Sequence, residues 1–423
     1  MHCTNCGEKR VAEFIYCPFC GVKLDVVVSA QRLFSLGQNV SEKEAIENYF
    51  LSGFAYEAIL CLLNKYHGIE MSLSTLKRRL AEYNLRRRKQ EDITLDQLTG
   101  VIRSELDGPG CLSGYRSMWH TLRIKYGIVV PRREVEELLS QLDPDGVQER
   151  KRHKLKRRVY NSPGPNYCWH VDGYDKLKPY GLPIHGAIDG YSRRVMWLVV
   201  SRTNNDPDVM AKLYFDCVKE VGGCPRLLTT DCGTENGTMA DMQMFLRAEG
   251  NDELSGEKSH RYVPSPKNQR IEAWWSFLRR SRYAWWINFF KDMVDSGKLA
   301  SGNELHDSCV WFCFSNLIQE DLDFVRLHWN THTIRHSNYC NVSGVPDELY
   351  FLPETTNATD HLQPMTEAKL DEVKERCRQY SDDSDFLDYF QHVMDLEHLQ
   401  MPRNWREAIV LFEHLVLVAQ YQT

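Results

Sequence analysis

The chain is 423 residues long, with 42% hydrophobic and 26% charged residues, a composition that excludes a largely disordered protein and predicts several folded domains. Its formal net charge is −6, yet residues 1–160 carry more Lys and Arg than Asp and Glu, whereas the remainder is acidic. This asymmetry indicates a front segment that faces nucleic acid. We expect neither a signal peptide nor a membrane span, and therefore an intracellular protein with no membrane partner.

Residues 1–24 contain two Cys-x-x-Cys pairs, each followed by glycine. The four cysteines are Cys3, Cys6, Cys17 and Cys20. Two such pairs in a reducing compartment suit a closed tetrahedral Zn²⁺ site, and zinc would stabilise a segment too small to fold by apolar burial. We therefore predict a structural zinc ribbon, with a redox Cys-x-x-Cys pair as the alternative.

Residues 38–90 predict three short helices that form a helix-turn-helix module. Ser41 followed by Glu44 is a capping-box pattern, Gly68 is a helix-stop residue, and the third helix starts after Ser72 or Ser74. A basic outer face on the last helix is typical of a major-groove reader. The basic residues of this helix and of the run that follows it are Lys77, Arg78, Arg79, Arg86, Arg87 and Arg88. We predict that they bind DNA; a helical bundle with a solvated charged face is the alternative.

Residues 91–148 predict a second helical, helix-turn-helix-like module. Gly127 ends one helix and Pro131 suits the first turn of the next. The strongly basic residues 149–160 lack an apolar pattern and are predicted to be a linker. Such a run contacts phosphates or acts as a nuclear-import signal, so we expect a nuclear protein, although a merely solvated run is equally compatible.

Residues 161–298 show strands alternating with helices, the pattern of an α/β domain with a mixed sheet, which we expect to be five-stranded. Strands are expected at residues 168–174, in a pair around a turn near Asp189, at 225–235 and at 260–266. Helices are expected at residues 206–223, 238–250 and, as one long helix, 268–297. The last region, 299–423, is expected to be mainly helical.

Three acidic residues occupy distinctive places in this pattern. Asp172 lies in the first strand, Asp231 ends another strand, and Glu272 lies near the start of the long helix. Carboxylates that meet at one end of a sheet can hold two divalent cations about 4 Å apart for phosphoryl transfer, and Mg²⁺ or Mn²⁺ prefers such oxygen ligands. The residues expected on the same side of the helix as Glu272 are Ser276, Arg279 and Tyr283. Arg279 is therefore a candidate phosphate ligand.

The motifs around these acids resemble a known family. They are Trp-x-x-Asp at 169–172, Ile-Asp-Gly-x-Ser-Arg at 188–193, Thr-Asp-x-Gly-x-Glu at 230–235 and Pro-x-Asn-x-x-x-Glu at 266–272. Residues 160–290 are similar to the catalytic core of retroviral-type integrases and cut-and-paste transposases, and weaker similarity extends over 110–355. The resemblance implies an RNase H-like fold in which Asp172, Asp231 and Glu272 are the catalytic, metal-binding acids. It also implies that Asn268 shapes the loop before the helix and Gly233 the turn after Asp231.

The expected protein is multidomain, with a zinc ribbon, two helical modules, a central RNase H-like core and a helical C-terminal region. By resemblance, it is a DNA integrase or transposase of a eukaryotic transposon, using two divalent metals for strand cleavage and transfer. A homo-oligomer is also implied, with the aromatic-rich helix as the first candidate interface. The alternatives are a domesticated, catalytically silent DNA-binding protein on the same scaffold, and a metal-dependent nuclease.

Overall fold

The computed structural model describes residues 40–85, 93–144, 160–335, 342–374 and 385–421. Contacts divide the chain into two compact units. The first comprises Met1–Val159, Arg280–Trp285 and Leu327–Thr356, and the second comprises Tyr160–Arg279, Trp286–Arg326 and Asn357–Thr423. The predicted zinc ligands, the basic run at 86–88 and residues 145–159 lie outside the described residues, so those predictions stay predictions.

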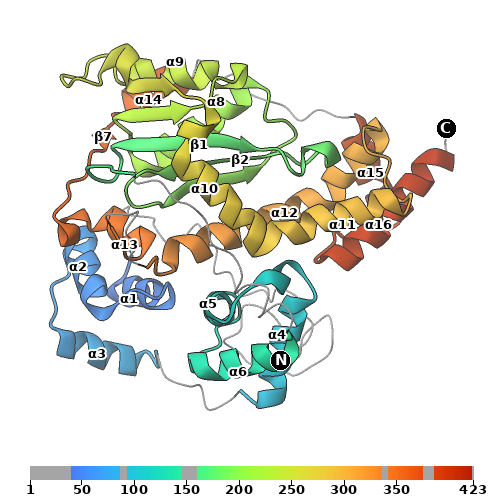
Figure 1. Ribbon diagram of the computed structural model, residues 1–423, viewed down its shortest axis with the longest axis horizontal. Helices are drawn as coiled ribbons and strands as arrows, with labels where there is room; N and C mark the ends of the chain where they lie inside the picture. The colour runs from blue at the N-terminus through green and yellow to red at the C-terminus, as the bar shows by residue number, and fades with distance from the viewer. Residues whose placement is uncertain (1–39, 86–92, 145–159, 336–341, 375–384, 422–423) are drawn as a thin grey trace. The chain divides into compact units, whose positions relative to one another are not determined.

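The second unit is built on a mixed five-stranded sheet with the order β3-β2-β1-β5-β6 (Figure 1). β1 (Cys168–Tyr174), β2 (Ile184–Asp189) and β3 (Val195–Val200) are antiparallel neighbours, whereas β5 (Leu227–Thr230) and β6 (His260–Tyr262) run parallel to β1. The strands lie where the sequence predicts them because their apolar, β-branched runs are bounded by turn residues. The expectation of a mixed five-stranded sheet with helices is confirmed.

Helices cover both faces of this sheet. Trp169 of β1 contacts Tyr214 of α8 (Pro207–Val221) at a ring separation of 6.3 Å, which places α8 on one face. Successive residues of a strand point to opposite faces. His170 and Asp172 therefore point to the other face, where α10 (Gln269–Leu278) packs on β1 and β2. Asp172 consequently lies on the α10 side of the sheet; Figure 1 shows α10 crossing the strands.

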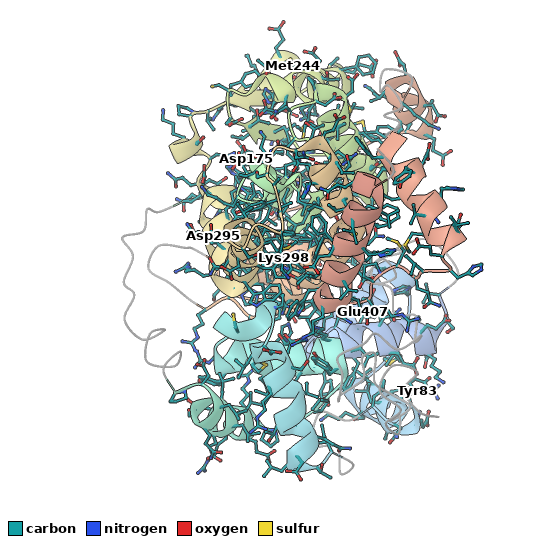
Figure 2. The ribbon with its side chains drawn as sticks, turned by 90° about the vertical axis from the view of Figure 1, so that its right-hand side faces the viewer. Tyr83, Asp175, Met244, Asp295, Lys298 and Glu407 are labelled. Atoms are coloured by element: carbon teal, nitrogen blue, oxygen red, sulfur yellow. The ribbon has the colours of Figure 1, made fainter. Side chains whose placement is uncertain are left out.

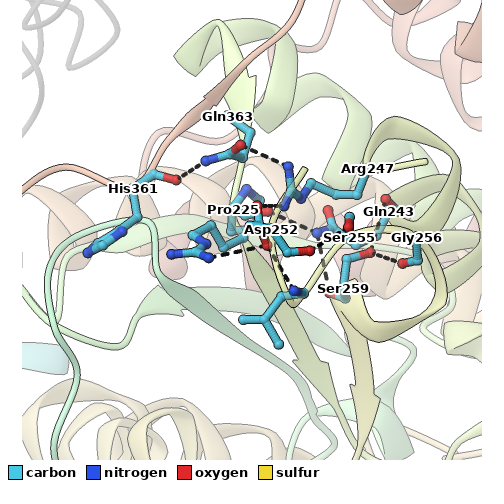
Figure 3. A network of polar contacts seen from close by, with 11 residues as sticks. Pro225, Gln243, Arg247, Asp252, Ser255, Gly256, Ser259, His361 and Gln363 are labelled. Atoms are coloured by element: carbon cyan, nitrogen blue, oxygen red, sulfur yellow. Dashed lines mark hydrogen bonds and ion pairs between the residues drawn. The ribbon is translucent and has the colours of Figure 1, made fainter. Parts of the chain in front are cut away.

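A buried arginine that follows α9 links this helix to the residues near position 363. α9 (Gly237–Leu246) ends at Arg247, whose guanidinium pairs with Asp252 and donates to Gln363 Oε1 at 2.8 Å (Figure 3). Gln363 belongs to β7 (Gln363–Pro364), which pairs antiparallel with β4 (Gly223–Cys224). Arg247 is almost fully buried, and the contacts with Asp252 and Gln363 offset the free-energy cost of burying its charge. The network holds residues after the core domain against the core itself.

The remaining helices of the second unit form an aromatic and aliphatic core. They are α11 (Ala284–Asp295), the first part of α12 (Glu304–Thr331), α14 (Glu367–Lys374), α15 (Asp385–Leu396) and α16 (Trp405–Tyr421). Phe289 contacts Phe314 and Trp405, and Lys298 pairs with Glu413 at 2.6 Å (Figure 2 labels Lys298, and Glu407 of α16). The largely helical C-terminal region is confirmed. The side chains of Trp286 and Phe290 are buried within this unit, so they serve its core.

The expected single helix over 268–297 is interrupted. Between α10 and α11, residues Arg279–Tyr283 form a π-helical turn. A π turn holds more residues than an α turn, so the side chains after it are rotated relative to a continuous α-helix. Tyr283, expected on the side of Glu272, is instead fully buried. That part of the sequence prediction is wrong because it assumed one uninterrupted period of 3.6 residues.

The first unit begins with α1 (Glu42–Leu51), α2 (Tyr56–His67) and α3 (Leu73–Glu82). The predicted ends are confirmed: Ser41 and Glu44 form a capping box, Gly68 adopts a left-handed C-cap with φ 64°, and Ser72 is the N-cap of α3. Within this unit, Lys65 donates to the carbonyl of Phe351, the last residue of α13 (Pro346–Phe351), at 2.8 Å. Helix α2 thus contacts a segment that lies 286 residues further along the chain.

The second helical module comprises α4 (Leu95–Leu106), α5 (Tyr115–Tyr126) and α6 (Arg132–Leu142) around an apolar core. Gly127 ends α5 with φ 69°, as predicted, whereas Pro131 is the N-cap of α6 and lies just before its first turn. In this core Glu105 is buried and accepts from Lys125 at 2.6 Å, from Tyr126 at 2.7 Å and from Arg282 at 3.1 Å. Burial alone would raise the pKa of Glu105, but the two cations hold it well below its usual range.

Replacing Glu105 with alanine is expected to destabilise the protein by about 3–5 kcal/mol, because two largely buried cations would lose their counter-charge. Urea denaturation followed by circular dichroism measures this change. Glu137→Ala is the control, since Glu137 pairs with Arg133 on the surface; its loss should cost less than about 1 kcal/mol. Equal effects of the two substitutions would contradict the structural role of Glu105.

None of the helices in the described part of the chain combines the length and the apolar character that crossing a bilayer requires.

Candidate active site

Asp172 lies in the second half of β1, directly opposite Gly186 of β2. Its Oδ2 accepts a hydrogen bond of 2.8 Å from Nε1 of Trp275. Burial raises the pKa of Asp172 to about 7; the Trp275 bond opposes this effect, while the charges of Glu272 and Asp231 add to it. The three acids are therefore near enough to influence one another electrostatically.

Asp231 directly follows β5, the parallel neighbour of β1. The parallel register of these strands pairs Cys168 with Leu227 and His170 with Thr229, and the same offset places Asp231 level with Asp172. Residues at one level of adjacent strands lie about 4.8 Å apart along the sheet. Oδ1 of Asp231 accepts from the amide of Gly233 at 3.2 Å and from Nδ2 of Asn236 at 2.8 Å. Gly233 thus shapes the turn after the acid, as the resemblance implies.

Glu272 lies in the first turn of α10 and is partly exposed. Its pKa is raised, first by burial and then by the charge of Asp231. At about 100° per residue, Ser276 and Arg279 follow Glu272 on one side of the helix, and both are exposed. This face therefore presents a carboxylate and a guanidinium to solvent.

The start of α10 is fixed to β1 by Asn268, which is fully buried. Nδ2 of Asn268 donates to the carbonyl of Val171 at 2.8 Å, and its Oδ1 accepts from Nδ1 of His170 at 2.7 Å. His170 Nε2 in turn accepts from the Tyr160 hydroxyl at 2.7 Å, which fits a neutral imidazole. Burial lowers the pKa of His170 to about 4, in keeping with this tautomer.

Residues 159–358 match the family model of the integrase core domain. The chain carries an integrase core domain. The matched segment contains the five-stranded sheet, the three acids and α10, so the resemblance drawn from the sequence motifs is confirmed. Among curated proteins, no sequence matches this chain.

An integrase core implies DNA binding and a general dependence on divalent metal. Among the described residues, no group of three or more His, Cys, Asp or Glu side chains is arranged to hold a metal ion. The chemistry of the donor set fits Mg²⁺ or Mn²⁺, because all three candidates in the integrase core are carboxylates. A cation near Asp172 and Glu272 would also offset the effects that raise their pKa values.

The candidate DNA-binding residues differ in exposure. Lys77 and Arg78 are exposed on α3. Arg79 is partly buried and pairs with Glu42 at 2.8 Å and with Glu82 at 2.9 Å, so it links α3 to α1 within the module. Its proposed role in DNA contact is weakened, because two carboxylates already neutralise it.

Three residues of the integrase core were not anticipated as parts of the site. Trp275 was assigned to the apolar stripe of the helix, but an indole also carries an N–H donor that seeks a partner when buried. Asn236 follows Asp231 by five residues and contacts it through a turn. Gly186 lies opposite Asp172 across the sheet. Only the polar atom of Trp275 gave a sequence signal; the other two depend on tertiary geometry.

Proposed function

We propose that this protein is a metal-dependent DNA integrase or transposase that cleaves DNA strands and joins them to a target. The observation that supports the proposal is the alignment of Asp172 with Asp231 on adjacent strands. The charges of Glu272 and Asp231 also raise the pKa of Asp172, and the charge of Asp231 raises that of Glu272. Two Mg²⁺ or Mn²⁺ ions held by these acids would activate the attacking hydroxyl or water and stabilise the leaving oxygen. Asp172 would also be suited to accept a proton near neutral pH in the metal-free protein, because burial raises its pKa to about 7.

The exposed face of α10 supports substrate positioning. Arg279 follows Glu272 by about two helical turns on the same side, so a phosphate bound by its guanidinium would lie along the row that contains the acid. Ser276 lies between them and can donate a hydrogen bond to the same backbone. We infer that this row orients the DNA strand at the acids.

The test uses the full-length protein with supercoiled plasmid and a labelled oligonucleotide in the presence of Mg²⁺, Mn²⁺ or a chelator. Metal-dependent nicking together with joining of the oligonucleotide is expected, and both should be lost in Asp231→Asn and Glu272→Gln. Nicking without joining would identify a nuclease instead. DNA binding with neither activity would identify a silent DNA-binding protein, and activity in the acid variants would overturn the site assignment.

We also propose that α3 contacts DNA through Lys77 and Arg78. The double substitution Lys77→Ala and Arg78→Ala is expected to weaken DNA binding and to make the salt dependence of log K less steep by roughly two units, if each residue neutralises one phosphate. Fluorescence anisotropy with labelled duplex DNA at several salt concentrations measures both quantities. The control is Lys212→Ala with Lys219→Ala, which removes the same charge from α8. An equal loss in the control would show a nonspecific charge effect.

The zinc ribbon at Cys3, Cys6, Cys17 and Cys20, the nuclear location and the homo-oligomer remain predictions from the sequence and the resemblance. Zinc content of the purified chain, measured by atomic emission, should be one ion per chain if the ribbon forms.

A further inference from the structure

Side-chain hydrogen bonds join β1 to α10 and to Asn268, the N-cap residue of that helix. Asn268 holds the backbone of Val171 and the ring of His170, and Trp275 holds the carboxylate of Asp172. Three consecutive residues of β1 are therefore bonded to one helix. All these bonds lie within the second unit and are buried or partly buried.

The spacing along α10 places these contacts around Glu272. Asn268 and Trp275 are seven residues apart, about two helical turns, so they face the same side of the helix. Glu272 lies between them, within about 60° of each around the axis. The helix that supplies one acid thus also supplies the donor that fixes another acid, Asp172.

The Trp275 ring fits against the sheet because the residue that it packs on, Gly186, has no side chain. A Cβ at Gly186 would lie 3.0 Å from Cη2 of Trp275 and 3.2 Å from the carbonyl of Trp197. Gly186 is the residue paired with Asp172 in the sheet, so the gap lies beside the acid. Tyr174 covers the indole at a ring separation of 5.2 Å, and Trp275 is only 5% exposed. The indole is consequently held in one place by packing on its sides.

We propose that Trp275 is a positioning residue of the active site, which acts with Asn268 as a clamp that sets the distance between Asp172 and Glu272. The clamp rests on the proposed function, since it assigns these two acids to one metal site. The bond from Trp275 to Oδ2 would restrict rotation of the Asp172 carboxylate, so that Asp172 and Glu272 could hold a divalent cation together. Gly186 is part of the same device, because any larger residue there displaces the indole.

The test measures the hydrogen bond and the metal affinity separately in the full-length protein. ¹⁵N-tryptophan labelling gives the indole N–H signal of Trp275, assigned by its absence in Trp275→Phe. In the metal-free protein, Asp172→Asn is expected to shift this signal because the charged acceptor is lost. Mn²⁺ affinity, measured by electron paramagnetic resonance, is expected to fall about tenfold or more in Trp275→Phe, as is typical when a partner of a metal ligand is removed.

The matched control is Trp274→Phe, which removes an equally buried indole from the neighbouring position of the helix. It should leave Mn²⁺ affinity within about twofold of wild type, a change far below that expected for Trp275. In the Asp172→Asn background, Trp275→Phe should have no further effect on Mn²⁺ affinity, because its partner carboxylate is already gone. Unchanged affinity in Trp275→Phe, or an equal loss in the Asp172→Asn background, would overturn the clamp.

These readouts distinguish the clamp from the proposed function. If wild type binds Mn²⁺ and Asp172→Asn does not, but Trp275→Phe binds like wild type, only the clamp fails. If wild type binds no Mn²⁺, the proposed function fails and the clamp's metal role fails with it, while the indole signal still decides whether the hydrogen bond exists. Gly186→Ala should reproduce the affinity loss of Trp275→Phe with the indole intact; affinity equal to wild type would remove Gly186 from the device.

Discussion

Replacing Asp172 with asparagine is expected to lower DNA cleavage by about a thousandfold or more, because a metal that stabilises developing charge contributes several kcal/mol to the transition state. The substitution keeps the shape of the side chain and an oxygen that can accept from Trp275, so the fold and DNA binding should persist. Initial rates of plasmid nicking in Mg²⁺ measure the first effect, and anisotropy with duplex DNA measures the second. Asp175→Asn is the control, because Asp175 is exposed just beyond β1 (Figure 2).

The same substitution is expected to stabilise the metal-free protein above neutral pH. The folded-state pKa of Asp172 is raised to about 7 from 3.8, so ionisation is harder in the folded than in the unfolded chain. No penalty exists below about pH 4, where both states are protonated; it grows as pH rises and is complete above about pH 7. Asp172→Asn removes a penalty on the order of 2–4 kcal/mol at pH 8. A lower melting temperature than wild type in chelator at pH 8 would contradict this origin of the raised pKa.

Together these two predictions mean that Asp172 would promote DNA cleavage while lowering the stability of the metal-free protein. Unpaired carboxylates at one end of a sheet repel one another and resist burial, and a metal ion would relieve both costs. Mg²⁺ or Mn²⁺ should therefore raise the melting temperature of wild type but not of Asp172→Asn. A structural role for Asp172 would give the reverse pattern, with the variant less stable under all conditions.

The sequence was sufficient to predict most of the strands and helix ends, and it singled out the three acids as candidates. Strands β1, β2, β3 and β5 were predictable because apolar runs with turn residues at their ends are local signals. The caps at Ser41, Gly68 and Gly127 were equally local, since each depends on one residue and its immediate neighbours. The three acids became candidates because their flanking motifs resemble those of a family, while the alignment of Asp172 with Asp231 on adjacent strands follows from strand register.

The interactions that hold the site were not predictable in the same way. Trp275 and Asp172 are 103 residues apart, and their hydrogen bond requires Gly186 on a third element. The π turn at Arg279–Tyr283 depends on packing rather than on a local pattern, so the helical period failed there. Arg79 was placed on the basic outer face of its helix, and its ion pair with Glu42 gave no local signal because Glu42 lies on another helix. Each of these features involves a contact between elements that a linear pattern does not encode.

Segments that follow one another in the sequence belong to different compact units of the structure. Residues after the sheet separate: Leu327–Thr356 join the first unit, whereas Asn357–Thr423 belong to the second. In the first unit, Lys65 pairs with Glu354 at 3.1 Å and Tyr66 donates to the carbonyl of Phe351 at 3.0 Å. The three helices α1 to α3 are therefore stabilised by a segment that follows the sheet. Truncation after the sheet would remove this support even though the three helices are intact in sequence.

The protein is expected to lose stability steeply as pH falls from about 6.5 toward 4, because several buried histidines are neutral in the folded state. Burial lowers the pKa of His185 to about 3, of His170 to about 4 and of His328 to about 3. The unfolded chain binds these protons near pH 6.5, so each such histidine costs about 2 kcal/mol at pH 5. Urea denaturation at pH 7, 6 and 5 measures the loss.

Buried carboxyls with raised pKa values have the opposite effect on stability. The net effect of acidification therefore depends on whether such carboxyls or the buried neutral histidines are more numerous. Asp172 and Asp189 have pKa values raised to about 7 and about 6, so the folded state gains protons on acidification and is stabilised. Histidines with lowered pKa values outnumber carboxyls with raised values among the described residues. These histidines are His67, His120, His170, His185, His260, His306, His328 and His361. The unfolded state therefore binds more protons between pH 4 and 6.5, and acidification favours unfolding.

A single substitution can measure how much one buried histidine, His185, contributes to the pH dependence of stability. His185 Nδ1 accepts from Trp197 Nε1 at 3.1 Å, and a glutamine there can accept the same bond without titrating. His185→Gln should reduce the slope of stability against pH by up to one proton, about 1.4 kcal/mol per pH unit near pH 5. His392→Gln, at an exposed position, is the control. If both variants keep the wild-type slope, the acid sensitivity arises elsewhere; if only His185→Gln flattens it, buried neutral histidines set the lower pH limit at which the integrase core stays folded.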